Sequence, residues 1–197
     1  MTDLSDMPVL PQVDEDALLE ELKEKSLPLP VIKPLLTRIQ DEAHHYFRET
    51  LDADLLVRHR ATLIDRVLRA LWRFRNIATQ DIALIAVGGY GRAELHPHSD
   101  IDLLLLARDE DSINRHASDL QDFITLLWDI KLDIGHSVRT LDECVTEAKG
   151  DLTIITNLLE SRTLIGDETL HSELRARITP EAQWPAAVFF EAKSEEL

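Results

Sequence analysis

The sequence predicts an α+β fold, with α/β-like features: a small mixed sheet covered by helices, behind an N-terminal layer of helices. Two apolar, strand-like stretches, residues 83–87 and 100–106, flank a glycine-rich turn. A third stretch, residues 132–138, reads L-D-I-G-H-S-V and alternates as a strand does. Helical patterns separate and surround these stretches. Such an order is typical of a sheet with helices packed on it.

Length and composition limit what kind of protein this is. Its 197 residues are enough for one substantial core, and its 21 Lys and Arg against 37 Asp and Glu give a formal charge of −16. Surfaces that grip nucleic acid are basic, so direct nucleic-acid binding is not expected. The lone Cys144 cannot form an internal disulfide, and no apolar run approaches membrane-spanning length. We expect a soluble, cytoplasmic protein without a membrane partner.

The first part of the chain is predicted to be helical. Residues 1–12 carry two prolines and no period, which indicates a loose tail. Helical patterns follow at residues 14–25, 31–50 and 54–75, with the prolines of S-L-P-L-P breaking the chain after the first. The third helix carries an apolar stripe. It also carries arginines that we expect to form a mostly solvated face rather than a substrate-binding one: Arg58, Arg60, Arg66, Arg69, Arg73 and Arg75.

In the second part of the chain, one predicted helix precedes the third strand and further helices follow it. Residues 112–129 have one apolar face, and Thr140-Leu141-Asp142-Glu143 forms a capping box that begins another helix. Trp72 and Trp128 stand at apolar helical positions, so we expect both in the core. The remaining helical patterns cover residues 152–161, 169–177 and 185–197.

The most informative stretch is residues 83–106, which read A-L-I-A-V-G-G-Y-G-R-A-E-L-H-P-H-S-D-I-D-L-L-L-L. Residues two apart in a strand share a face, so Asp100 and Asp102 should point the same way while Ile101 and Leu103 enter the core. Two adjacent carboxylates repel, and each raises the other's pKa unless a cation sits between them. We therefore expect a divalent metal, and Mg²⁺ suits a site of one or two carboxylates plus phosphate oxygens.

The glycines of the same stretch point to a phosphate ligand. Gly88, Gly89 and Gly91 leave no side chain between backbone and ligand, and successive N–H groups in such a turn attract an anion such as a triphosphate. Arg92 is expected to add a bidentate phosphate contact, and Ser99 a further phosphate contact or a cap. The third glycine of a dinucleotide fingerprint and the Gly-Lys-Ser/Thr of an NTPase phosphate loop are both absent.

Some nearby residues have two interpretations. His96 and His98 flank Pro97, and they are either metal ligands or residues that shape the turn, since proline biases the residue before it toward an extended backbone. Asp133 is either a third active-site carboxylate or a polar residue on the outer face of an edge strand. For the two histidines the turn-shaping role is favoured, whereas the residue pattern alone leaves the role of Asp133 open.

These motifs resemble a known family. V-G-G-Y-G-R-A-E-L-H-P-H-S-D-I-D-L-L-L is similar to the active-site signature of the polymerase-β-like nucleotidyltransferase superfamily, Gly-Gly or Gly-Ser followed by Asp-x-Asp. The stretches L-L-W-D-I-K-L-D-I-G-H-S-V-R-T-L-D-E-C and D-L-T-I-I-T-N-L-L-E-S-R-T-L-I-G-D narrow this. They resemble the bacterial bifunctional uridylyltransferase/uridylyl-removing enzymes that modify the nitrogen-signalling PII protein. Ala93 departs from the pattern, which usually has glycine there.

The resemblance implies an activity and a site. It implies transfer of UMP from UTP to a tyrosine of the PII protein, with release of pyrophosphate. It also implies a two-metal site for Mg²⁺, with Mn²⁺ as a possible substitute, held by Asp100, Asp102 and Asp133 as catalytic residues. Asp133 would be the third carboxylate of the superfamily.

The resemblance also implies a domain organisation. Residues 77–150 would be the nucleotidyltransferase core, between a helical region at 13–76 and a helical continuation at 151–197 that is cut short. In the family the transferase region extends further, and HD hydrolase and glutamine-sensing ACT domains follow. We therefore expect neither uridylyl removal nor glutamine sensing here, and weak transferase activity from this chain alone. The alternative is a module of the same fold that binds a nucleotide or a partner without turnover.

Overall fold

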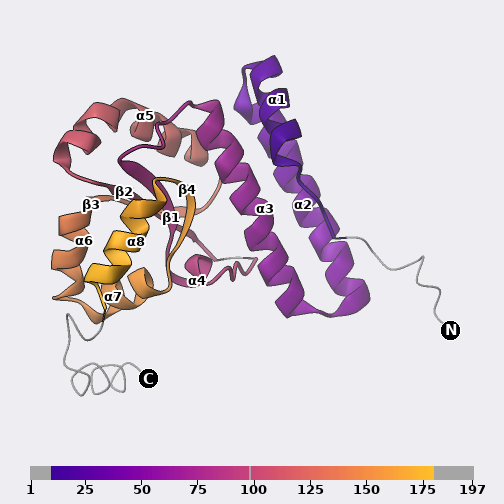
Figure 1. Ribbon diagram of the computed structural model, residues 1–197. Coiled ribbons are helices and arrows are strands. Elements are labelled where there is room, and N and C mark those ends of the chain that lie inside the picture. Colours follow the sequence, from indigo (N-terminus) through magenta and orange to yellow (C-terminus); the bar gives the residue numbers. More distant parts are fainter. Residues whose placement is uncertain (1–9, 98, 180–197) are drawn as a thin grey trace.

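The computed structural model describes residues 10–97 and 99–179 and contains a four-stranded mixed sheet between two layers of helices (Figure 1). The strands are β1 (Ile82–Ala86), β2 (Ile101–Ala107), β3 (Ile134–Thr140) and β4 (Arg162–Gly166). Their order across the sheet is β3-β2-β1-β4, with β1 antiparallel to β2 and β4, and β2 parallel to β3. The predicted α+β fold with a small mixed sheet is confirmed.

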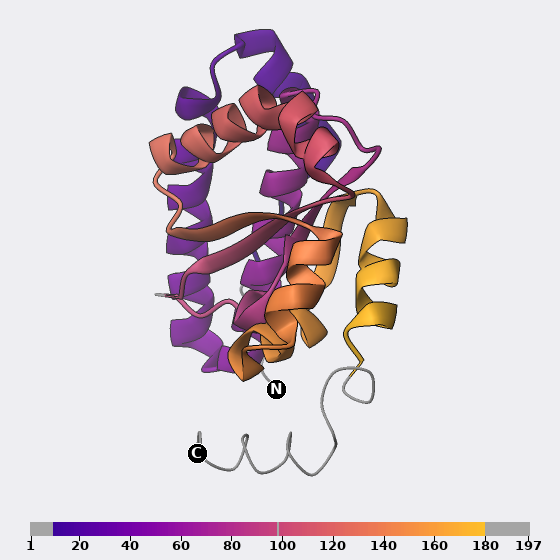
Figure 2. The ribbon, with the colours of Figure 1, turned by 90° about the vertical axis from the view of Figure 1, so that its left-hand side faces the viewer.

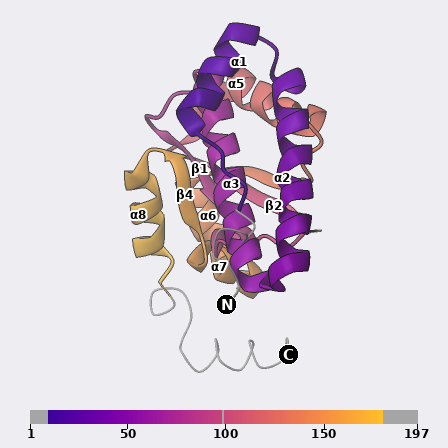
Figure 3. The ribbon, with the colours of Figure 1, turned by 90° about the vertical axis from the view of Figure 1, so that its right-hand side faces the viewer.

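Three helices form the N-terminal layer, as expected. They are α1 (Glu15–Lys25), α2 (Pro28–Thr50) and α3 (Ala53–Phe74), seen from outside in Figure 3. The side chain of Asp14 caps α1 by accepting hydrogen bonds from the N–H groups of Asp16 and Ala17. Helix α2 begins three residues earlier than predicted, at Pro28, because the first turn of a helix needs no N–H donor and tolerates proline.

The arginines of α3 contradict the prediction of a mostly solvated face. Arg69 Nε donates to Glu15 Oε2 at 2.7 Å, and Arg73 Nη1 lies 3.2 Å from Glu15 Oε1 and 2.9 Å from Asp16 Oδ1. Arg66 Nη1 donates to the carbonyl oxygen of Val13 at 2.7 Å. These arginines therefore join α3 to α1. The partners lie more than fifty positions away in the chain, beyond the reach of a local pattern.

Among the other described helices, one shares the face of the sheet that α3 covers, three cover the second face, and a single helical turn follows β1 (Figure 2). Their bounds are α4 (Gly88–Gly91), α5 (Glu110–Asp129), α6 (Leu141–Ala148), α7 (Leu152–Leu159) and α8 (Glu168–Arg177). The predicted capping box at α6 is confirmed: Glu143 N–H donates to Thr140 Oγ1 at 3.2 Å, and Thr140 N–H donates to Glu143 Oε2 at 2.7 Å. The helix predicted at 185–197 lies outside the described residues. No described helix combines the length and apolarity that crossing a membrane requires.

The two central strands, β1 and β2, are buried on both faces of the sheet. Ile101, Leu103 and Leu105 pack into a core with α3 and α5, whereas Leu104 and Leu106 pack into a second core with α6, α7 and α8. The prediction that Ile101 and Leu103 enter the core is confirmed, with exposures of 3% and 1%. Alternate residues of β2 thus point into two different cores, and the sheet lies between them.

Two sequence-based expectations about this part of the fold need correction. Trp72 is fully buried as predicted, but Trp128 is 54% exposed, because Leu126 and Leu127 occupy the buried face of α5. The ring of Trp128 makes an edge contact with that of His136, with centroids 5.4 Å apart. No strand was predicted at β4, which has one buried residue, Leu164, and therefore no clear alternation.

Candidate active site

The glycine turn lies at the end of β1 as one turn of helix, α4. The N–H of Val87, just before α4, donates to the carbonyl oxygen of Asp102 at 3.1 Å, so the turn is tied directly to β2. Gly88 has φ +59°, and a Cβ at Gly91 would overlap the backbone carbonyl oxygen of Glu160. The fold itself therefore requires glycine at these two positions.

Gly89 differs from its neighbours because the fold does not require it. A Cβ there would meet only Arg92 Nη2 at 3.6 Å and the carbonyl oxygen of Glu94 at 3.8 Å, which are ordinary contacts. The first N–H groups of a helix have no partner within it, and no backbone contact between the turn and the rest of the described chain uses those of Gly88 and Gly89. Space and two donors are thus available to an anion.

Asp100 and Asp102 lie at the start of β2, Asp100 exposed and Asp102 half-buried. Burial, and then the nearby charge of Asp100, raise the pKa of the Asp102 carboxyl. No cation of the protein is among the groups that act on Asp102, so within the described part of the chain nothing offsets the charge of this carboxylate. Carboxylate oxygens are hard ligands, so the pair fits a divalent cation such as Mg²⁺.

Five of the predicted site residues line one open pocket of about 400 Å³. They are Gly89, Arg92, Ser99, Asp100 and Asp102. The N–H of Ser99 donates to the carbonyl oxygen of His96 at 3.2 Å, which fits the turn-shaping interpretation of His96. His98 lies outside the described residues.

Arg92 lines this pocket but is already paired. Its Nε lies 3.0 Å from Glu94 Oε2 and its Nη1 lies 2.5 Å from Glu160 Oε2. These hydrogen bonds raise the pKa of the Arg92 guanidinium. A phosphate would therefore have to share the Arg92 guanidinium with Glu94 and Glu160, or displace them from it.

Asp133 immediately precedes β3 and is exposed. Its carbonyl oxygen accepts the N–H of Ile101 at 2.9 Å, and Ile101 pairs with Ile134, so the register places Asp133 beside Asp100. Within residues 10–97 and 99–179, no three His, Cys, Asp or Glu side chains are grouped closely enough to hold a metal ion. A three-carboxylate metal site including Asp133 therefore stays a prediction.

Two residues beside Asp102 escaped the sequence analysis. Gly135 pairs with Asp102 across the parallel strands, and a Cβ there would stand 2.5 Å from Asp102 Oδ1. Asn157 of α7 lies across the turn, with its Oδ1 3.5 Å from the position of a Cβ at Gly88. Both residues and Asp102 line a second pocket, of about 250 Å³. Glycine inside a strand often marks such a close approach, whereas nothing in the sequence pointed to Asn157.

A buried polar network supports the turn from behind. Tyr90 Oη donates to Asp65 Oδ1 at 2.6 Å. Arg162 donates to the same carboxylate through Nη1 at 2.6 Å and Nη2 at 2.8 Å, and its guanidinium carbon lies 5.1 Å from the centre of the Tyr90 ring. Burial, followed by Asp65, raises the pKa of the Tyr90 phenol well above its usual value, so the phenol remains a donor. The network links α3, α4 and β4.

Comparison with known proteins identifies the fold and relatives of this chain. A family model described as "Nucleotidyltransferase domain" matches residues 64–165, a range that contains the turn, the Asp100–Asp102 pair and all four strands except the last residue of β4. A solved structure titled "Crystal structure of the toxin-antitoxin with AMP-PNP" aligns over 66% of this chain and 90% of that one, with 17% identity and a TM-score of 0.34. That likeness is too low to carry an argument.

Curated relatives are more similar. The chain is 45% identical over 193 residues to the bifunctional uridylyltransferase/uridylyl-removing enzyme of Azotobacter vinelandii (strain DJ / ATCC BAA-1303). It is 42% identical over 194 residues to the protein of that name from Pseudomonas putida (strain W619). Each alignment covers 95% of this chain and 21% of the relative. The chain thus spans about a fifth of the length of these relatives.

Proposed function

Because the chain belongs to the nucleotidyltransferase domain family, we propose that it transfers UMP from UTP to a tyrosine hydroxyl of the PII protein, releasing pyrophosphate, with Mg²⁺ as cofactor. The observation that carries the proposal is the uncompensated pair Asp100 and Asp102 beside the glycine turn. The uridylyltransferase names of the relatives support UTP as the nucleotide. The motif resemblance to PII-modifying enzymes supports the acceptor.

The metal ligands in this proposal are Asp100 and Asp102, with Asp133 completing a second site. Held by these residues, two Mg²⁺ ions, or Mn²⁺ in their place, would supply positive charge that stabilises the attacking and leaving oxygens of an in-line displacement. The half-buried Asp102 would bind the metal ion more tightly than an exposed carboxylate does. Burial and the charge of Asp100 both destabilise the ionised Asp102, and a bound cation would offset both effects.

The remaining site residues would bind and orient the substrates. The N–H groups of Gly88 and Gly89 would hold the triphosphate, beside a turn shaped by Gly91. Arg92 and Ser99 would add phosphate contacts from the same pocket wall. Asp133 would accept the proton of the tyrosine hydroxyl, whose oxygen bonds to the α-phosphorus as the bond to the pyrophosphate oxygen breaks.

UTP and the PII protein are the proposed partners, and nucleic acid and membrane are not among them, in keeping with the formal charge of −16. A cytoplasmic location suits the single thiol of Cys144, which is buried, with its pKa raised by burial to about 12.

A second candidate is a module that binds nucleotide without turnover. It is favoured by the pairing of Arg92 with Glu94 and Glu160, which occupies the proposed phosphate-binding cation. The two candidates differ in one measurable respect, because only the transferase moves labelled UMP onto an acceptor.

The experiment incubates this chain with UTP labelled at the α-phosphate, Mg²⁺ and the PII protein, and follows label on the acceptor. A full-length relative serves as the positive control, and labelled ATP, CTP and GTP test the base. Transfer from UTP to one tyrosine supports the transferase. Saturable UTP binding with no transfer would support the binding module, and label on a PII variant with that tyrosine replaced by Phe would refute the acceptor.

A further inference from the structure

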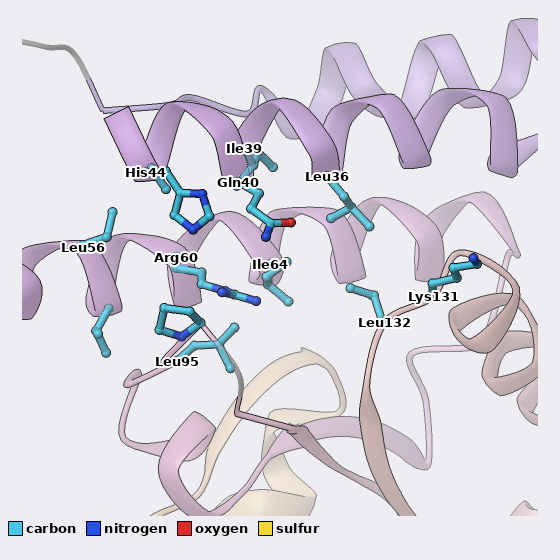
Figure 4. A pocket seen from close by; sticks show the side chains of 13 residues that line it. Leu36, Ile39, Gln40, His44, Leu56, Arg60, Ile64, Leu95, Lys131 and Leu132 are labelled. Atoms are coloured by element: carbon cyan, nitrogen blue, oxygen red, sulfur yellow. The ribbon is translucent and has the colours of Figure 1, made fainter. Parts of the chain in front are cut away.

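A cavity of about 150 Å³ lies between α2, α3 and the segments that lead into Asp100 and Asp133 (Figure 4). It contains none of the residues proposed above for nucleotide transfer. Several of its wall residues belong to the core on the α3 side of the sheet, whereas Asp102 faces the opposite side with Leu104. Its apolar walls include Leu36, Ile39, Leu56, Ile64, Leu95 and Leu132.

Arg60 places a positive charge in this cavity. It extends from α3 into the space between the helices and the loop (Figure 4). Arg60 is half-buried, and it has no hydrogen-bond or ion-pair partner in the described part of the chain. Burial alone lowers the pKa of its guanidinium. By contrast, Arg66, Arg69 and Arg73 of the same helix all have partners on or beside α1.

The surroundings of Arg60 favour an anion with an apolar body. A half-buried, unpaired guanidinium is costly to the folded state, and an anionic ligand would remove that cost. Gln40 and His44 point from α2 toward the same space and could donate further hydrogen bonds (Figure 4). Lys131 lies at one end of the cavity and is exposed, and its ammonium group points away from Arg60 (Figure 4).

Size and charge narrow the ligand class. Pockets for drug-sized ligands are about 300–1,000 Å³, so this cavity is too small for a nucleotide. A single buried cation balances one negative charge, and a planar guanidinium matches a carboxylate through two parallel hydrogen bonds. A protein of charge −16 also repels a polyanion more strongly than a monoanion.

We propose that this cavity binds a small organic monocarboxylate, with its carboxylate on Arg60 and its apolar chain against the leucine and isoleucine walls. The probe is hexanoate, titrated into the full chain while its chemical shifts or heats of binding are followed. Hexanamide, which has the same shape without the charge, is the matched ligand. Saturable hexanoate binding at least about tenfold tighter than hexanamide binding, or about 1.4 kcal/mol, is expected.

The variants separate the site from general charge effects. Arg60→Met removes the charge and keeps an apolar side chain, and it should weaken hexanoate binding at least about tenfold. Arg58→Met removes an exposed arginine of the same helix and should leave binding unchanged. Arg60→Lys keeps a positive charge without the planar guanidinium, so its hexanoate affinity should lie between those of the wild type and Arg60→Met.

Three outcomes would overturn the proposal. They are no saturable hexanoate binding by the wild-type chain, equal affinity for hexanamide, and equal loss in Arg60→Met and Arg58→Met. The comparison of the two ligands on the wild-type chain decides the matter even if Arg60→Met fails to fold. None of these measurements uses UTP or PII, so they test this site independently of the proposed transferase.

Discussion

Gly135 faces Asp102 across the parallel strands β2 and β3 so closely that a Cβ at Gly135 would stand 2.5 Å from Asp102 Oδ1. The absence of a side chain at Gly135 therefore leaves room for the Asp102 carboxylate. The orientation of the candidate metal ligand depends on a residue thirty-three positions further along the chain.

Gly135→Ala tests this relationship. We expect the protein to fold, because the clash involves the end of a side chain, but the displaced carboxylate should weaken Mg²⁺-dependent UTP binding about tenfold or more, or 1.4 kcal/mol. The control is Gly150→Ala, where the nearest atom to a new Cβ is the carbonyl oxygen of Glu147 at 3.8 Å. Calorimetry with UTP and Mg²⁺ measures both. Equal affinities in the two variants would contradict the role of Gly135.

Asp100→Asn and Asp102→Asn test the proposed metal ligands. Each replacement keeps the shape of the side chain but removes a charged oxygen ligand that a hard cation prefers. We expect Mg²⁺-dependent UTP binding to be abolished while the far-ultraviolet circular dichroism stays unchanged. Titration of Mg²⁺ at fixed UTP measures the effect. Unaltered binding in both variants would remove these residues from the metal site.

The raised pKa of Asp102 predicts a pH-dependent stability change in metal-free buffer. The unfolded carboxyl ionises near its ordinary value of 3.8, below the folded pKa, so its contribution to stability is complete below 3.8 and is lost as the pH rises through the folded value. Asp102→Asn lacks this loss. The variant should therefore be more stable than the wild type at pH 7, with the difference vanishing toward acid pH in urea titrations. A difference of the same size at both pH values would argue against ionisation as its cause.

Gly89→Ala separates a ligand-binding glycine from a structural one. The chain has room for the new Cβ, so we expect a normal denaturation midpoint, with UTP affinity weakened by on the order of a few kcal/mol through lost N–H contacts and steric clash. Gly91→Ala provides the contrast, because its Cβ would overlap the carbonyl oxygen of Glu160 and should destabilise the fold. If Gly89→Ala binds UTP like the wild type, Gly89 only forms the turn.

Tyr90→Phe tests the network behind the turn. It removes one hydrogen bond to the buried Asp65 carboxylate, which keeps its two bonds from Arg162. Hydrogen bonds to charged groups contribute about 1.5–3 kcal/mol, so a loss of that size in the free energy of unfolding is expected. Urea denaturation measures the loss, with Tyr46→Phe, whose ring is also buried, as a control. A loss below that of the control would show that the hydrogen bond contributes little.

Much of this protein follows from interactions within a few positions of the chain. The cap of α1 at Asp14, the capping box of Thr140 and Glu143, and the alternation of buried residues in β2 all depend on helix and strand periods. The same local rules place the glycine turn directly before the strand of Asp100 and Asp102. The α+β fold and the nucleotidyltransferase family could therefore be recognised from the sequence.

The tertiary structure alone decided which distant residues meet. Arg162 reaches Asp65 across 97 positions, Arg69 reaches Glu15 across 54, and Gly135 makes space for Asp102. The order β3-β2-β1-β4 determines these contacts, and a strand's own alternation does not specify its neighbour. Arg60 is the clearest case. Nothing in the sequence distinguishes Arg60 from the other arginines on α3. It differs from them because the packing of α2 over α3 partly buries its charge without a partner.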